Sequence, residues 1–129
     1  MPEYSKEQLK GLYESIPKKL QDALYSEENG KSIKEICQKN KIEDSKMLFE
    51  INKYVGFVLL GLLAPDKLPS VFEKELKIKK DVSEELSSQI GHSVFYPVKD
   101  ILEPLYGIKM VITDAKKEEG PDTYRESTK

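Results

Sequence analysis

Hydrophobic residues recur every three or four positions along most of this chain, a spacing that places them on one face of an α-helix. The first such segment carries Leu9, Leu12, Tyr13 and Ile16. Ser5 and Gln8 stand at its start with the spacing of a capping box. Pro17 then ends this helix and can open the next, because only the first turn of a helix tolerates a missing backbone N–H. The pattern predicts two short helices before residue 25.

Two further helix starts are marked by polar side chains that can accept hydrogen bonds from free backbone N–H groups. Ser26 starts a helix that ends at Asn40 and turns inward the side chains of Ile33, Ile36 and Cys37. The acidic and hydroxyl residues at 43–45 start the next helix. Its hydrophobic residues predict a span of about 45–63.

The most apolar run of the chain, residues 54–64, contains eleven residues and no charge. A helix that crosses a bilayer needs roughly 20 apolar residues, so burial inside a folded domain is the better prediction. Because the run is apolar on all sides, the 45–63 helix is predicted to be the buried centre of the fold. Gly56 and Gly61 are interpreted as points where another backbone approaches closely, with a glycine-lined ligand slot as the alternative.

A third hydrophobic pattern runs through the C-terminal part of the chain. Val82, Leu86, Ile90 and Val94 follow one another at intervals of four. The same face continues beyond Pro97, which predicts one kinked helix over about 82–106 rather than two helices joined by a loop. Asp81 is interpreted as its N-cap, and Gly107 as part of its end.

These elements predict an all-α fold: a compact bundle of five to seven short helices around the 45–63 helix. Residues 1–112 form this helical domain, and 108–112 either pair as a strand or lie extended on it. Residues 113–129 are polar and are predicted to be a disordered tail. At 129 residues, the chain has the length of one domain.

Composition excludes several classes of function. Twenty-one basic and twenty-three acidic residues are mixed along the chain, so no concentrated basic surface for nucleic acid is expected. The single cysteine excludes an intramolecular disulfide and favours a reducing compartment. The N-terminus lacks the basic start and apolar centre of a signal peptide. The cytoplasm is therefore the expected location, and a membrane partner is not expected.

Candidate chemistry is sparse. His92 is the only histidine and is interpreted as a partly exposed structural residue, while Cys37 is interpreted as a small buried hydrophobe. A nucleophilic pair of these two residues remains an alternative without a local signature. No spacing of metal ligands and no phosphate-binding glycine loop is present. We expect no cofactor, no metal, no catalytic residues and no enzymatic activity.

Aromatic residues supply the candidates for protein binding. Phe95, Tyr96 and Tyr106 belong to the kinked helix, and Tyr124 and Arg125 stand in the tail as anchors of a short linear motif. The leading hypothesis is a small cytoplasmic protein-interaction module with an unidentified protein partner. One alternative is a peripheral membrane protein, and another is a small-molecule pocket near Gly56, Gly61 and His92. The oligomeric state stays open.

The chain resembles a group of uncharacterised small helical bacterial proteins. The likeness rests on the run 55–63 before the Leu68-Pro69 helix start, on 94–98 with Leu102, Leu105 and Tyr106, and on the tail motif 122–126. The resemblance implies an all-helical domain with a charged tail. It implies no activity, and no functional residue follows from it.

Overall fold

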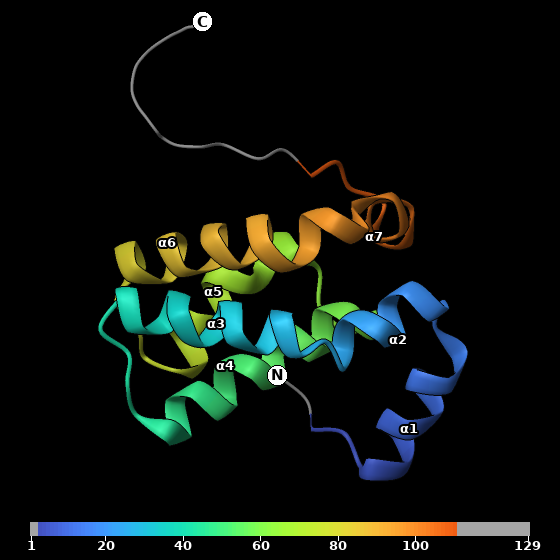
Figure 1. The fold of residues 1–129 in the computed structure, drawn as a ribbon, viewed down its shortest axis with the longest axis horizontal. Helices are drawn as coiled ribbons and strands as arrows, with labels where there is room; N and C mark the ends of the chain where they lie inside the picture. The colour runs from blue at the N-terminus through green and yellow to red at the C-terminus, as the bar shows by residue number, and fades with distance from the viewer. Residues whose placement is uncertain (1–2, 111–129) are drawn as a thin grey trace, which may run out of the picture.

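The computed structural model describes residues 3–110, and every regular element within that range is a helix (Figure 1). The prediction of an all-α bundle is confirmed. The helices are α1 (Lys6–Ser15), α2 (Lys18–Leu24), α3 (Glu27–Lys39), α4 (Ser45–Leu59), α5 (Leu68–Glu75), α6 (Lys80–Ile90) and α7 (Lys99–Tyr106). The predicted tail, 113–129, lies outside the described residues.

Local capping explains where the first helices begin. Ser5 and Gln8 form the predicted capping box before α1, with both side chains hydrogen-bonded to the other residue's backbone N–H. The Ser26 hydroxyl caps α3 by accepting from Asn29, and the Asp44 carboxylate caps α4 by accepting from Met47. These three predicted starts are confirmed.

Helix α4 forms the centre of the core, as predicted. It buries Ile51, Tyr54, Val55, Phe57, Val58 and Leu59. α3 and α6 lie side by side, with α4 and α5 packed against them (Figure 1). From α2, α5 and α7 the core receives the fully buried side chains of Leu20, Phe72 and Leu102.

Helix α4 ends at Leu59, whereas the hydrophobic pattern extended it to residue 63. Gly61 has a φ of +88°, a left-handed conformation that glycine adopts without steric cost and that stops the helix. The interpretation of Gly61 as a point of backbone approach is therefore corrected, because the residue turns the chain. Leu63 is still buried after the turn, which is why the apolar run continues past the helix.

The predicted kink in the C-terminal helix is confirmed. The chain stays helical from α6 to α7 but changes type twice, through a π-helical turn at Gly91–Phe95 and a 3₁₀ turn at Tyr96–Val98. Pro97 has no N–H and its ring collides with the preceding turn, so it interrupts the regular α-helical hydrogen bonding at this point. In Figure 1, α7 consequently points in a different direction from α6.

The predicted Asp81 cap is wrong. α6 begins at Lys80, because the backbone N–H of Ser83 already donates to the carbonyl of Lys79 at 2.8 Å. Asp81 lies in the first turn, where its carboxylate accepts from the N–H of Val82 and interacts favourably with the helix dipole. At the other end, Gly107 terminates α7 with a φ of +64°, as expected. Residues 108–110 then form neither helix nor strand.

Candidate functional site

Helix α1 is the helix least embedded in the core. It has an apolar side, yet none of its residues is fully buried. The ring of Tyr4, just before the helix, meets Phe57 edge to face with centroids 5.4 Å apart. At the other end, the side-chain amide of Gln21 donates to the carbonyl of Tyr13 at 2.7 Å. α1 is thus held near both ends while the middle of its apolar side stays partly open.

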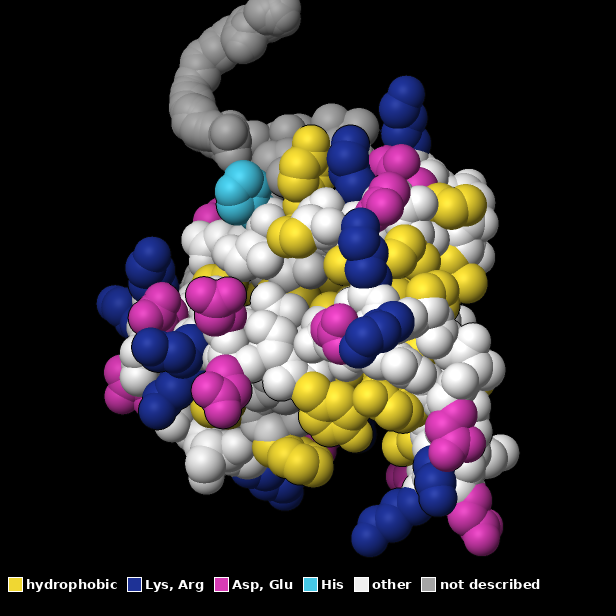
Figure 2. Space-filling view, turned by 45° about the vertical axis from the view of Figure 1, so that its right-hand side comes forward, with side chains coloured by type: hydrophobic (Ala, Val, Ile, Leu, Met, Phe, Trp, Pro, Cys, Tyr) yellow, Lys and Arg dark blue, Asp and Glu magenta, His cyan; other side chains and the backbone are white. Residues whose placement is uncertain are grey.

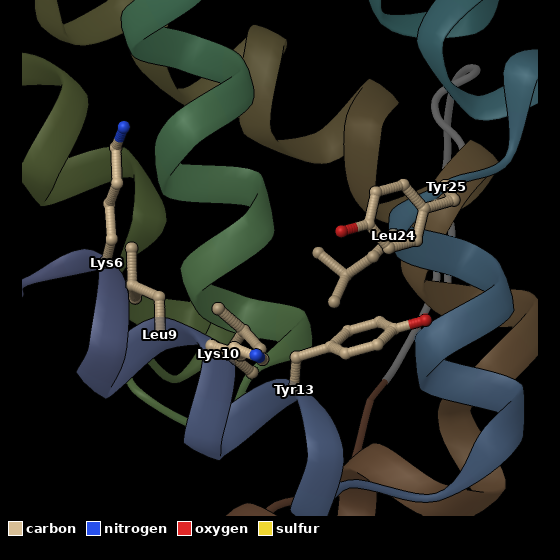
Figure 3. Close-up of a pocket in the computed structure, with 7 residues that line it drawn as sticks. Lys6, Leu9, Lys10, Tyr13, Leu24 and Tyr25 are labelled. Atoms are coloured by element: carbon tan, nitrogen blue, oxygen red, sulfur yellow. The ribbon is translucent and has the colours of Figure 1, made fainter.

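The open side of α1 forms one wall of a groove of about 350 Å³ (Figure 3). The end of α2 forms the opposite wall, and Leu60 at the end of α4 completes the lining. Tyr13 from α1 and Leu24 with Tyr25 from the end of α2 point toward one another across it. The lining residues are Lys6, Leu9, Lys10, Tyr13, Leu24, Tyr25 and Leu60.

Tyr25 is the most exposed large hydrophobic residue among residues 3–110, with 75% of its surface accessible. It follows α2 directly and precedes Ser26, whose hydroxyl caps α3. The Asn29 side chain donates to the carbonyl of Ala23 at 3.1 Å, which fixes this tight corner. The ring meets Tyr13 edge to face at 5.3 Å. The corner therefore holds Tyr25 at the rim of the groove.

The charges of the groove have one sign. Lys6 and Lys10 are its only charged lining residues. Both are exposed, and neither forms an ion pair with another described residue. Glu7 and Glu14 belong to the same helix but do not line the groove, so the lining itself carries two lysines and no carboxylate.

A second, smaller hollow of about 140 Å³ adjoins the groove, because Leu24 lines both. It lies between α3 and α4, and Gly56 and Asn52 of α4 line it together with Asn29 and Gly30 of α3. A Cβ added at Gly56 would lie 3.5 Å from the Leu24 side chain. The expected close neighbour of Gly56 is thus a side chain and not a backbone.

Hydrophobic side chains gather on the surface around this region. Figure 2 brings the α1 and α2 side of the molecule forward and shows them over the middle and lower part of that face, with a hollow opening beneath them. Small single apolar residues are normal on a protein surface. A gathered set beside a hollow is typical of a recognition surface.

The residues predicted to bind a partner do not line either hollow. Phe95 is a core residue with 1% of its surface accessible, because the π-helical turn directs it inward. Tyr96 is 38% exposed, and the Lys99 ammonium lies 4.8 Å from its ring centroid. The Tyr106 hydroxyl is hydrogen-bonded to α4. Tyr124 and Arg125 lie outside the described residues.

The two candidate reactive residues differ sharply in environment. Burial raises the pKa of the Cys37 thiol to about 11, which keeps it protonated and unreactive at neutral pH. His92 is exposed, and no hydrogen bond joins its imidazole to another described residue. Neither His92 nor Gly61 lines either of the two hollows described above, whereas Gly56 lines the smaller one.

Two features are absent from residues 3–110. No group of three or more histidine, cysteine or acidic side chains in this part of the chain is arranged to hold a metal ion. Within the same residues, no helix has the length and apolarity that a membrane crossing requires. The chain matches no protein family, no curated protein and no solved structure.

Proposed function

We propose that this protein is a small protein-interaction module without catalytic activity, and that the groove between α1 and α2 binds apolar side chains of its partner. The observation that supports this most directly is the partly uncovered apolar side of α1 facing the exposed Tyr25. Tyrosine is favoured at protein interfaces because it offers a large, rigid contact area together with a hydroxyl that tolerates water.

The free energy that a partner gains by covering Tyr25 is large enough to contribute to recognition. A tyrosine side chain buries 150–250 Å², and apolar burial contributes about 25 cal/mol per Å². Covering the accessible three-quarters of Tyr25 would contribute about 3–5 kcal/mol before the costs of association. Additional contacts with Leu9, Tyr13 and Leu24 are required for a stable complex, and they line the same groove.

We rank the alternative of a peripheral membrane protein second. An interfacial helix must expose its apolar side to the bilayer. In this structure, the apolar residues of α4 from Ile51 to Leu59 are packed in the core, and Phe49 is the exposed apolar residue of this helix. The cytoplasm remains part of the proposal, because a chain with one buried free cysteine suits a reducing compartment.

Capture of partners with matched full-length variants tests the proposal. Tyr25→Glu places a charge in the groove at an exposed position, so the fold should tolerate it. Tyr96→Glu is the matched control, because Tyr96 is also exposed but lies outside the groove. A third variant, Tyr124→Ala with Arg125→Ala, tests the tail motif.

We expect the wild type and the Tyr96→Glu variant to retain the same specific partner, and the Tyr25→Glu variant to lose it. Circular dichroism and thermal melting of each variant confirm that the fold is intact. A partner retained by Tyr25→Glu but lost by the Tyr96 or tail variant would refute the groove as the binding site. A wild-type protein that captures no specific partner would refute the interaction module itself.

A further inference from the structure

We infer that the partner segment is an acidic amphipathic helix that lies along α4 across both hollows, with carboxylates facing Lys6 and Lys10. This inference rests on the proposed function and adds to it the chemistry of the partner. Three features of the surface support it: the sign of its charge, the line of residues along α4, and the internal hydrogen bonds of its polar residues.

The positive charge of the groove lining favours a partner segment with acidic side chains. Lys6 and Lys10 stand four residues apart on α1, which places them on one side of the helix, one turn apart. No carboxylate lines either hollow, so nothing in the lining already pairs with them or repels an acidic ligand. Two carboxylates spaced by one turn of a partner helix would match the two ammonium groups.

The arrangement of the lining residues along α4 favours a helical partner segment. Asn52, Gly56 and Leu60 follow one another at four-residue steps along α4 and line the two hollows in turn. These positions span about 12 Å, at 1.5 Å per residue, which is slightly more than two helical turns. Gly56 in the middle lacks a side chain, which leaves the smaller hollow open beside the Leu24 side chain.

The volumes of the two hollows indicate which side chains of the partner helix can enter them. The larger hollow, about 350 Å³, admits a leucine or phenylalanine side chain, and the smaller one, about 140 Å³, admits a small aliphatic group. A helix presents such a pair at positions three or four residues apart. Leu24 then packs between the two anchors as the ridge that both hollows share.

Three polar lining residues each make one side-chain hydrogen bond within the protein. The Asn52 side-chain amide donates to the carbonyl of Leu48 at 2.9 Å, and that of Asn29 donates to Ala23. The Ser26 hydroxyl already accepts from the N–H of Asn29. An apolar helix face can therefore cover these residues without breaking an existing hydrogen bond.

Three synthetic helical peptides of equal length test the inference against the full-length protein. Each carries leucine at positions i, i+3, i+4 and i+7, and the remaining positions are filled with glutamate, glutamine or lysine in turn. Fluorescence anisotropy at low salt measures their affinities. We expect the glutamate peptide to bind about tenfold more tightly than the lysine peptide, because the glutamate peptide forms two exposed ion pairs with Lys6 and Lys10 whereas the lysine peptide is repelled by them. High salt should reduce the difference.

Protein variants assign the effect to the proposed residues. Lys6→Glu with Lys10→Glu should reverse the preference between the glutamate and lysine peptides. Lys79→Glu with Lys80→Glu is the control, because these exposed lysines lie at the start of α6, at the other end of the bundle (Figure 1). Gly56→Ala should weaken the glutamate peptide severalfold while leaving the melting temperature unchanged or higher, since alanine favours the helix.

The outcomes separate this inference from the proposed function. Equal binding of the three peptides, abolished by Tyr25→Glu, would overturn the acidic partner and leave the groove as the binding site. Binding of no peptide, together with a captured partner that Tyr25→Glu loses, would overturn the helical partner. Self-association of the protein that Tyr25→Glu abolishes would identify a second copy of this chain as the occupant and would also overturn the inference.

Discussion

The hydroxyl of Tyr106 in α7 donates a hydrogen bond to the carbonyl oxygen of Val58 in α4, at 2.6 Å. The same hydroxyl accepts a hydrogen bond from the backbone N–H of Leu63, at 3.3 Å. These contacts bracket Gly61, where α4 ends and the chain turns. One side chain from the last helix thus stabilises the end of the central helix and the turn that follows it.

Tyr106→Phe removes this hydroxyl and leaves the ring in place. We expect the variant to lose about 1–3 kcal/mol of unfolding free energy, because the N–H of Leu63 keeps no partner in a partly buried position. Chemical denaturation measures the loss. A variant as stable as the wild type would show that water replaces the hydroxyl at no cost.

Alkaline pH should remove the stabilisation that the Tyr106 hydroxyl provides. Burial raises the pKa of Tyr106 to about 12, against the lowering effect of the Leu63 and Gly61 backbone N–H groups. An unfolded tyrosine has a pKa near 10, so the folded state holds this proton more tightly. The resulting stabilisation is complete below about pH 10 and is lost as the pH rises toward about 12.

The difference between wild type and Tyr106→Phe isolates this effect from other alkaline titrations. Cys37 contributes a loss of the same sign, because its pKa is also raised, but it does so equally in both proteins. We expect the difference in unfolding free energy between the two proteins to shrink as the pH rises through this window. Urea denaturation in a pH series measures it, and a constant difference would contradict the prediction.

Sequence reasoning predicted the parts of the fold that depend on neighbouring residues. Ser5, Ser26 and Asp44 each cap a helix through a backbone N–H three residues away, so their roles follow from local spacing. The end of α4 was harder, because Leu63 is buried whether or not the helix continues to it. Hydrophobic periodicity indicates which residues are buried and does not indicate where a helix ends. The predicted end of α4 was therefore too late in the chain.

The groove could not be predicted from the sequence, because it depends on how α1 is placed against α2 and α4. The apolar side of α1 has the same pattern whether it is fully or partly covered. Tyr25 gives a weak signal, as an aromatic residue between a helix end and a capping serine. The aromatic residues chosen instead, such as Phe95, follow the hydrophobic stripe, and this stripe faces the core.

Leu59→Ala tests the central position of α4. The Leu59 side chain is 2% exposed, and its truncation should cost about 2–5 kcal/mol through lost burial and a residual cavity. Phe49→Ala on the same helix is the control, because Phe49 is 66% exposed and its loss should change stability by about 0.5 kcal/mol or less. Similar costs for both variants, measured by thermal or chemical denaturation, would contradict the packing of α4.

Two glycine substitutions should shift stability in opposite directions for purely conformational reasons. A Cβ added at Gly107 or at Gly11 would meet no atom within 4 Å, so neither change creates a clash. Gly107→Ala forces a side chain into a left-handed conformation and should destabilise the protein by about 1–2 kcal/mol. Gly11→Ala lies inside α1 and should stabilise it by about 0.5–1 kcal/mol.

Chemical denaturation measures the effect of Gly107→Ala. Amide hydrogen exchange of α1 measures the effect of Gly11→Ala, because α1 has no fully buried residue and can open locally. Changes of the same sign would contradict the backbone geometry at one of the two positions.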